Sequence, residues 1–320
     1  MKEKKKISIV LPGGGAKCVY QFGFLYALQN SKKKSRFWDK YIIESIRATS
    51  GGAFVAAYFA TDNMNALKEK MLAKNALTKL LVPWVNIPII GSYLNIPVGF
   101  YKCSMYRKDG LYWMVDNVDF NCVDPSGETC VGLEKLIISV TDLDHGTHHY
   151  VTGRDPDLRK FIIASASLWG AFTPEIINGK LYADGGMSEL AALSDNSSNL
   201  LINKPDKWNL KKNIEYLYID TQFYDVLDNE GVLHRFRDRY HPGRNLLEYS
   251  MRVIAMTTSI INYTNQHMYL TYGNNKNIKY IKYPIYDEKC CQHALDFNHD
   301  KAMHTFLVGY KKGVEFLKGL

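Results

Sequence analysis

The sequence predicts an α/β fold of three layers, α/β/α, around a mostly parallel central sheet. One observation is the apolar run at 7–11, which enters a glycine-rich turn and is followed by apolar residues at helical spacing. The second is a repeat of this order, with a strand over 41–48, a sharp turn at 49–52 and a helix of small residues through Ala60. Strand–turn–helix units in succession are typical of a parallel sheet covered by helices.

The elements further along the chain extend this sheet and close the fold. We expect strands at 136–140, 150–151, 180–183 and 214–220, helices at 160–167, 246–270 and 300–317, and surface loops at 194–212 and 224–244. We expect one domain over 1–320, with the motifs in about 7–190 and the part 210–320 completing the fold.

The composition is that of an ordinary globular protein, with 46% hydrophobic and 22% charged residues. A mean hydropathy of -0.23 argues against an integral membrane protein. The net charge of +8 comes partly from lysine clusters at 4–6, 32–34 and 204–212. We interpret these clusters as solvated faces, with a weak attraction to anionic lipid surfaces as the alternative. No nucleic-acid module accompanies the charge, so we expect no nucleic-acid partner.

The six cysteines show no metal-ligand spacing and no dense disulfide framework. We expect the adjacent Cys290 and Cys291 to be reduced thiols rather than metal ligands or a redox sensor. The apolar run at 7–11 is too short for the core of a signal peptide. We therefore expect a cytoplasmic protein.

The first chemical motif is the turn from Ala48 to Gly52, which is a near match to the G-x-S-x-G nucleophile elbow around Ser50. Such a turn needs small residues two positions either side of the serine, because the strand and the helix pack tightly there. It would present the serine hydroxyl at the N-terminus of the next helix. An isolated match of this kind is more often a helix N-cap serine.

The second motif is the run of glycines from Gly13 to Gly15, between a predicted strand and a predicted helix. Acyl transfer passes through an oxyanion that needs backbone N–H donors, and consecutive glycines expose them. A P-loop would need a serine or threonine after Lys17, and a dinucleotide loop would need glycine at Cys18. A tight structural turn is the remaining alternative.

The third motif is Asp184, followed by two glycines at the end of a short predicted strand. An Asp-Gly pair alone is typical of a turn. Beside Ser50 the carboxylate is a candidate general base, provided that burial raises its pKa. No histidine stands out as a triad member among His145, His148, His149, His267, His293, His299 and His304.

Together the three motifs resemble the patatin-like phospholipase family in order, spacing and context. Softer matches are Ser165 to Ser167, Phe172 to Pro174 and Val140 to Asp142. The resemblance covers about 7–190 well and 210–320 only in general character. It departs from the family pattern at Pro12, Cys18 and Ala48. A side chain at Cys18 would alter the loop if the backbone there required a positive φ.

The resemblance implies a lipid acyl hydrolase of the phospholipase A type, which cleaves carboxylic esters of phospholipids or acylglycerols through an acyl-enzyme. It implies neither a cofactor nor a metal. Besides the lipid, we expect a transient membrane surface and consider a protein activator as partners. The implied roles are nucleophile for Ser50, general base for Asp184, oxyanion hole for Gly13, Gly14 and Gly15, and support of the motifs for Lys17, Ala48, Gly52, Gly185 and Gly186.

The uncharged stretch at 80–101 contains Pro83, Pro88 and Pro97, which exclude a single membrane-spanning helix. Two interpretations stay open: a buried or lid-like loop, or an apolar acyl-chain wall that carries Trp84, Tyr93 and Phe100.

Three alternatives to the lipid hydrolase stay open. The strongest is a catalytically weak or inactive patatin-like protein with a lipid-binding or regulatory role. A nucleotide-binding protein is supported by the glycine loop alone. Within the hydrolases, a protease or a hydrolase of small esters is the third alternative.

Overall fold

The computed structural model describes residues 3–31, 35–85, 101–102, 104–122, 130–189, 191–193, 211, 213–221, 277–284, 287–292 and 294–320. The helix expected at 246–270 lies outside these residues, and so do nearly all of the two expected surface loops. The same is true of 86–100, with Tyr93 and Phe100, and of His267 and His293.

The described strands form one large sheet and one small ribbon. In spatial order the large sheet runs β10 (Ile278–Ile281), β9 (Ile214–Ile219), β1 (Lys5–Leu11), β2 (Tyr41–Thr49), β5 (Leu136–Asp142), β8 (Lys180–Asp184) and β7 (Glu175–Ile177), with β6 (Thr147–Thr152) on β5. The pairs from β10 to β5 are parallel, whereas β8, β7 and β6 pair antiparallel. The small ribbon pairs β3 (Val82–Pro83) with β4 (Tyr106–Arg107).

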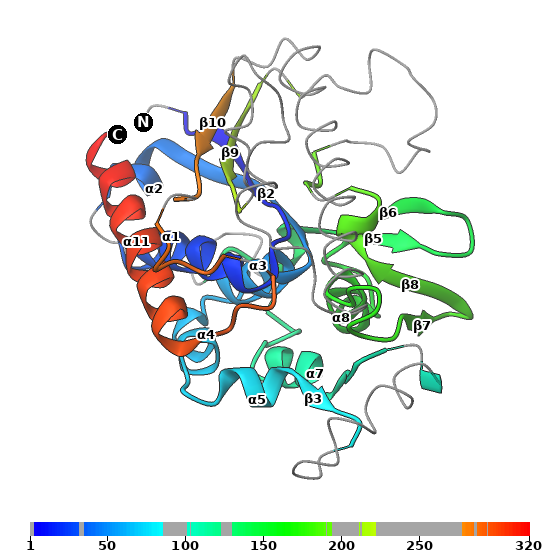
Figure 1. Ribbon diagram of the computed structural model, residues 1–320. Helices are drawn as coiled ribbons and strands as arrows, with labels where there is room; N and C mark the ends of the chain where they lie inside the picture. The colour runs from blue at the N-terminus through cyan, green and yellow to red at the C-terminus, as the bar shows by residue number, and fades with distance from the viewer. Residues whose placement is uncertain are drawn as a thin grey trace, which may run out of the picture.

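Helices connect and flank the strands. They are η1 (Gly15–Lys17), α1 (Cys18–Asn30), α2 (Arg36–Lys40), α3 (Gly51–Ala60), α4 (Met64–Met71), α5 (Ala76–Leu80), α7 (Asp109–Val115), η2 (Leu133–Lys135), α8 (Leu158–Ser165), η3 (Gly185–Met187) and α11 (His299–Lys318). The predicted class, a mixed α/β fold with a mostly parallel central sheet flanked by helices, is confirmed (Figure 1).

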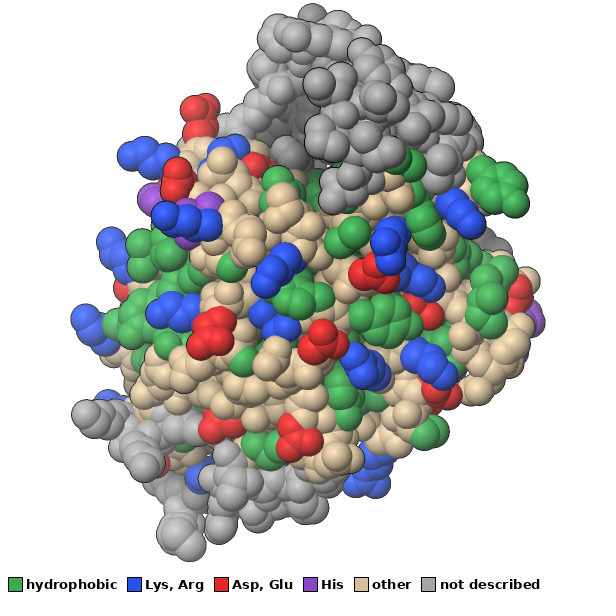
Figure 2. All heavy atoms as spheres, turned by 90° about the horizontal axis from the view of Figure 1, so that it is seen from below, with side chains coloured by type: hydrophobic (Ala, Val, Ile, Leu, Met, Phe, Trp, Pro, Cys, Tyr) green, Lys and Arg blue, Asp and Glu red, His purple; other side chains and the backbone are tan. Residues whose placement is uncertain are grey.

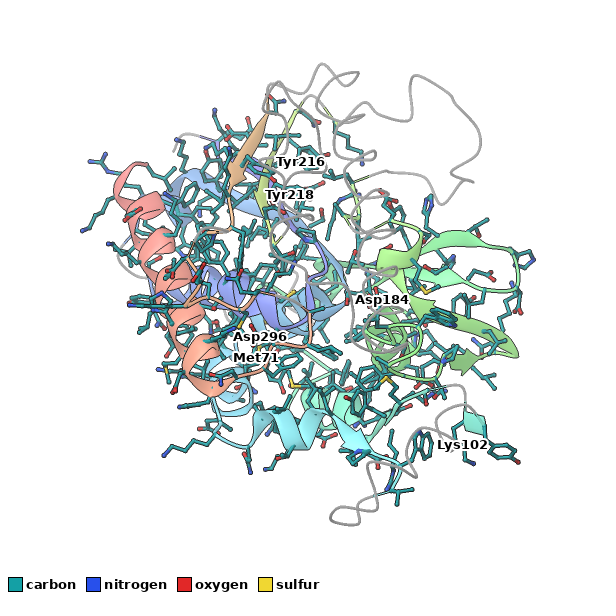
Figure 3. The ribbon with its side chains drawn as sticks, in the orientation of Figure 1. Met71, Lys102, Asp184, Tyr216, Tyr218 and Asp296 are labelled. Carbon is teal, nitrogen blue, oxygen red and sulfur yellow. The ribbon has the colours of Figure 1, made fainter. Side chains whose placement is uncertain are left out.

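The central strand β1 separates two packed regions, because successive side chains of a strand point to opposite faces. Ile7, Ile9 and Leu11 belong to the main core, which also contains the apolar side chains of α1, α3 and α8. Val10 points the other way and packs with Tyr216 and Tyr218 of β9 in a smaller cluster. Both tyrosines lie along that strand in Figure 3.

The last helix, α11, lies directly against the first helix, α1 (Figure 1). Close approach requires glycine here: a Cβ at Gly23 would lie 2.2 Å from the carbonyl oxygen of Phe306. The same holds for Gly309, whose Cβ would lie 2.2 Å from the carbonyl oxygen of Tyr20. The rings of Phe22 and Phe306 fill the seam, with centroids 4.8 Å apart.

Among the residues that the structure describes, no helix is both long enough and apolar enough to cross a bilayer. On the face of the molecule in Figure 2, lysine and arginine side chains are interspersed with aspartate and glutamate. Of the three lysine clusters, 32–34 and nearly all of 204–212 lie outside the described residues, so their interpretation as solvated faces stays a prediction.

Candidate active site

The predicted elbow is a tight turn in which β2 ends at Thr49 and α3 begins at Gly51. Ser50 between them has φ 54° and ψ -130°. A non-glycine residue with such a positive φ costs about 1–3 kcal/mol, and it persists only where its surroundings hold it. Ser165 does so, because its Oγ accepts from the Ser50 amide at 2.8 Å and donates to the carbonyl of Ser139 at 2.7 Å.

The glycines after Ser50 are explained by the strands and loops that press against them. A Cβ at Gly52 would lie 2.5 Å from the carbonyl oxygen of Leu11. A Cβ at Gly51 would lie 2.9 Å from the carbonyl oxygen of Gly15. The elbow is therefore packed directly against the glycine loop. Ala48 is fully buried in β2, where it pairs with Leu11 and Ile138.

Ser50 and Asp184 are joined by a hydrogen bond. The Oγ of Ser50 donates to Oδ2 of Asp184 at 2.6 Å. The amide of Gly186 donates to Oδ1 of the same carboxylate at 2.7 Å, and Thr141 donates to the Asp184 carbonyl at 2.8 Å. Asp184 lies in the middle of the molecule, where β8 ends (Figure 3). Both carboxylate oxygens thus have a donor, which fixes the orientation of the side chain.

Asp184 is 3% exposed, and this burial raises the pKa of its carboxyl group to about 6. Burial disfavours the charged form of an acid. The hydrogen bonds from Ser50 and from the Gly186 amide act in the opposite direction, because they stabilise the carboxylate. A carboxylate with this pKa is ionised near neutral pH and is a better proton acceptor than an exposed one.

The glycine loop lies between β1 and η1. Gly15 has φ +55°, and a Cβ there would lie 2.1 Å from the carbonyl oxygen of Ala294, so this position requires glycine. The Ala16 amide donates to Ala294 at 2.7 Å and the Lys17 amide to Gly14 at 3.1 Å. Within the described part of the chain, the amides of Gly14 and Gly15 donate to no acceptor.

Two side chains that sequence reasoning missed hold this loop. Thr221, two residues after the end of β9, donates from Oγ1 to the carbonyl of Gly13 at 2.6 Å. Gln21 of α1 donates from Nε2 to Pro12 and to Ile219, both at 2.9 Å. One sequence feature could have indicated Thr221, namely the parallel strand expected at 214–220, which ends next to it. The carboxyl ends of parallel strands share one edge of a sheet.

Lys17 was expected to support the glycine motif. Its side chain is 5% exposed, and burial lowers the pKa of its ammonium group to about 8. The nearby Asp220 carboxylate opposes that shift because it stabilises the cation. Asp220 in turn accepts from the hydroxyl of Tyr280 and from the Thr221 amide. Lys17 therefore lies at the base of the loop, next to the residues that anchor Gly13.

The departure at Cys18 is accommodated without strain. Its φ is -64°, in the right-handed helical region. A side chain would alter the loop only if φ at Cys18 were positive, and it is not. The positive φ falls on Gly15 instead. The thiol of Cys18 is buried and donates to the carbonyl of Pro12 at 3.9 Å.

No histidine in the described ranges hydrogen-bonds to Ser50 or Asp184. His145 pairs with Asp142 at 2.9 Å, and His304 pairs with Asp287 at 2.6 Å. The carboxylate of Asp184 is thus the partner of the Ser50 hydroxyl without an intervening imidazole.

Ser50 lies on a strained turn between a strand and a helix of an α/β protein, and its hydroxyl is hydrogen-bonded to a buried carboxylate. This is the arrangement of a nucleophile elbow. Residues 9–115 match the Patatin family, described as patatin-like phospholipase. The resemblance predicted from the motifs is therefore confirmed, and it supports a lipid hydrolase in general terms. The matched segment contains the glycine loop and the elbow.

Thirteen chains of solved structures also match. VipD from Legionella pneumophila has a TM-score of 0.40 and 13% identity, over 99% of this chain and 67% of that one. ExoU from Pseudomonas aeruginosa, in complex with SpcU, has a TM-score of 0.30 and 16% identity, over 85% of this chain and 53% of that one. The chain thus spans about half to two thirds of their length. No curated protein sequence matches it.

Proposed function

We propose that the chain is a lipid acyl hydrolase of the phospholipase A type, which cleaves carboxylic esters of phospholipids or acylglycerols. The observation that carries this proposal is the 2.6 Å hydrogen bond from Ser50, on a strained elbow, to the buried Asp184 carboxylate. The pKa of Asp184, raised to about 6, suits a general base near neutral pH.

In the acylation step, Asp184 takes the proton from the Ser50 hydroxyl while Oγ attacks the carbonyl carbon of the ester. The negative charge that develops on the carbonyl oxygen is stabilised by backbone amides of Gly13 to Gly15, and by the free amides at the start of α3. Collapse of the intermediate breaks the ester C–O bond. The departing alcohol, a lysolipid or a glyceride, takes the proton from Asp184.

In the deacylation step, a water molecule attacks the acyl-enzyme. Asp184 removes one proton from the water, and the acyl C–Oγ bond to Ser50 breaks as the fatty acid leaves. Ser50 regains its proton from Asp184. A single carboxylate therefore serves both steps, which is consistent with the direct hydrogen bond from Ser50 to Asp184.

We propose that the protein is cytoplasmic and contacts a membrane surface transiently to obtain its substrate. Two aromatic side chains support this, because Tyr101 is 83% exposed and Trp169 is 57% exposed. Their segments meet at the bridge between Ser104 and Gly170. Exposed tyrosine and tryptophan rings favour the interface between water and lipid. A protein activator would be a further partner of this surface.

The test is incubation of the purified chain with vesicles of mixed phospholipids, followed by mass spectrometry of released fatty acid and lysolipid. We expect release by the wild type and none by Ser50→Ala or Asp184→Asn. The matched controls are two further substitutions. Ser45→Ala removes a buried hydroxyl from β2, the strand that leads to Ser50, and Asp142→Asn removes a carboxylate from β5. Vesicle binding without release by the folded wild type would favour the catalytically inactive lipid-binding alternative.

A further inference from the structure

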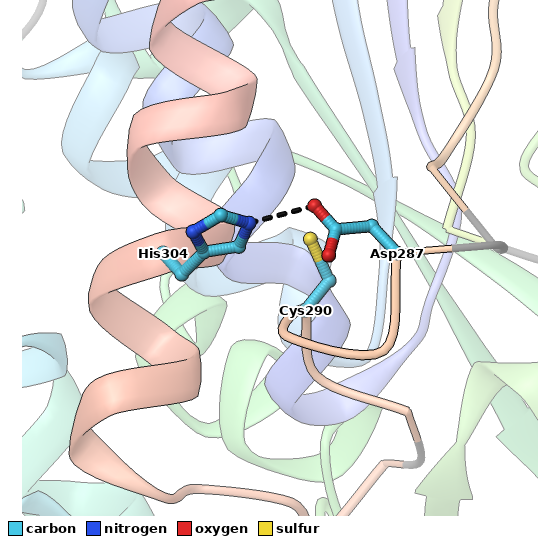
Figure 4. Close-up of side chains that lie close together, drawn as sticks. All are labelled: Asp287, Cys290 and His304. Carbon is cyan, nitrogen blue, oxygen red and sulfur yellow. Dashed lines mark hydrogen bonds and ion pairs between the residues drawn. The ribbon is translucent and has the colours of Figure 1, made fainter.

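A second cluster of chemically active side chains lies outside the Ser50–Asp184 pair. It consists of Asp287, Cys290 and His304, whose ligand atoms all lie within 4.8 Å of one another. Nε2 of His304 lies 2.6 Å from Oδ2 of Asp287, and the thiol of Cys290 points toward the same space (Figure 4). Carboxylate, thiolate and imidazole are the three ligand types that zinc takes in proteins.

The local backbone explains why Asp287 and Cys290 face the same point. They are the ends of a turn closed by the bond from the Cys290 amide to the Asp287 carbonyl at 2.9 Å. Gln292 fixes the turn, because its Nε2 donates to the carbonyls of Asp287 and Cys290 at 2.9 and 3.0 Å. The hydrogen-bonded turn therefore holds the side chains of Asp287 and Cys290 close together.

The third side chain, His304, comes from α11. This helix begins with a side-chain cap, in which Asn298 accepts from the amides of Asp300 and Lys301 at 3.0 and 3.2 Å. The turn is tied to the same helix, since the Cys291 amide donates to Thr305 at 2.8 Å. His304 therefore has a fixed position relative to the other two side chains.

We propose that Asp287, Cys290 and His304 form a zinc site with three protein ligands and a fourth position open to water. Cys290 is buried, whereas the side chains of Asp287 and His304 are 34% and 35% exposed. The site therefore has an inner thiol and an outer opening through which an ion and a water molecule can enter. The mixed N, O and S donor set favours zinc over magnesium or calcium, which prefer oxygen ligands alone.

The geometry needs only a small adjustment to hold the ion. Tetrahedral zinc with bonds of about 2.0–2.3 Å keeps its ligand atoms roughly 3.3–3.8 Å apart. The contact between Asp287 and His304 at 2.6 Å would open by less than about 1 Å. The sulfur of Cys290, which lies within 4.8 Å of both other ligand atoms, would move closer by at most about 1.5 Å. The zinc ion would replace the ion pair and release the proton of the Cys290 thiol.

Occupancy of this site would also support the glycine loop. Beyond Cys290 and Cys291 the chain reaches Ala294, whose carbonyl accepts from the Ala16 amide at 2.7 Å and lies against Gly15. A metal ion bound by the three side chains would link the turn from Asp287 to Cys290 to α11. It would therefore also fix the position of Ala294, which contacts the glycine loop.

The first test is a titration of the tag-free, full-length chain with Co²⁺ after treatment with a chelator. We expect one equivalent to bind, with the thiolate-to-cobalt charge-transfer band and the intense visible bands of a tetrahedral site, and Zn²⁺ to displace it. Cys290→Ser should lose the charge-transfer band, and His304→Gln should lose tight binding. Cys122→Ser, which removes the thiol of a partly buried cysteine elsewhere, should behave as the wild type.

The second test is thermal unfolding with and without Zn²⁺, with circular dichroism to verify that each variant is folded. A ligand that binds only the native state raises its Tm. We expect Zn²⁺ to raise the Tm of the wild type and of Cys122→Ser, but not that of Cys290→Ser or His304→Gln. A folded wild type without a thiolate–cobalt band, or an unchanged band in Cys290→Ser, would overturn the zinc site.

Discussion

Ser50 and Asp184, 134 positions apart in the sequence, are brought to a 2.6 Å hydrogen bond by the register of β5. This strand pairs parallel with β2, where Ser139 lies beside Thr49, the residue before Ser50. It also pairs antiparallel with β8, where Val140 lies beside Asp184. Two adjacent residues of β5 therefore align the ends of both strands, and the sheet itself positions the pair.

The expected pH dependence of turnover follows from the proposed role of Asp184 as general base. In that role Asp184 must be ionised to accept the Ser50 proton, and burial raises its pKa to about 6. We expect kcat/KM to rise about tenfold per pH unit below pH 6 and to level off above it. A pH profile on a soluble ester checks this. A profile that levels off near pH 4 would mean that an ordinary exposed carboxylate is the base.

The stability of the fold should also depend on the ionisation of Asp184, but it should fall with rising pH where the activity rises. The pKa of Asp184 is raised from 3.8 when the chain folds, so the folded state binds more protons between about pH 4 and 6 and loses stability as pH rises through this window. The cost at pH 8 is at most about 3 kcal/mol, at 1.36 kcal/mol per pKa unit.

Asp184→Asn removes that cost while it keeps the shape of the side chain. We expect a higher Tm than the wild type at pH 8 and no such gain at pH 4, by thermal unfolding at both values. Asp157→Asn, at a partly exposed carboxylate paired with Lys160, is the control and should show no gain at pH 8. Equal Tm values of Asp184→Asn and wild type at pH 8 would contradict the raised pKa.

Gly15→Ala should damage both the loop and the activity. The new Cβ would lie 2.1 Å from the Ala294 carbonyl oxygen, in addition to the cost of φ +55°. Gly146→Ala is a matched control, because Gly146 has φ +64° but nothing within 4 Å of its Cβ position. We expect about 1–2 kcal/mol of destabilisation for the control and clearly more for Gly15→Ala, by urea unfolding. Equal losses would show that the loop can relax.

Thr221→Val tests the anchor that sequence reasoning missed. The substitution keeps the size of the side chain but removes the hydrogen bond to the Gly13 carbonyl. We expect a loss of about 0.5–1.5 kcal/mol in unfolding free energy and a severalfold fall in kcat. Thr61→Val, which removes a hydroxyl bonded within the end of α3, should leave kcat unchanged. Unaltered kcat in Thr221→Val would separate the anchor from catalysis.

Much of the fold was predictable, because the motif-bearing strands and helices have strong local signals. The strands expected at 7–11, 41–48, 136–140, 180–183 and 214–220 correspond to β1, β2, β5, β8 and β9, with boundaries that differ by a few residues at most. The helices expected at 160–167 and 300–317 correspond to α8 and α11. Short elements such as α5 and β7 were not predicted, since three to five residues carry little periodicity.

The supports of the candidate site were not predictable for a different reason. Thr221 and Ala294 contact the glycine loop only because β9 and the segment before α11 return to it from far along the chain. Their residue types have no chemical signature of their own. The proposed zinc ligands differ from the expectation that Cys290 is a reduced thiol rather than a metal ligand. The sequence shows no metal-ligand spacing there, because His304 is separated from Asp287 and Cys290 by a loop and the first turn of α11.

The most direct test of the central claim is labelling with a fluorophosphonate probe, with the adduct located by peptide mass spectrometry. If Ser50 is the nucleophile and Asp184 its base, the wild type forms one adduct, on Ser50, and Ser50→Ala forms none. Asp184→Asn then labels at least about 100-fold more slowly, because the general base is lost. An adduct on another residue, or labelling of Asp184→Asn at the rate of the wild type, would contradict the account.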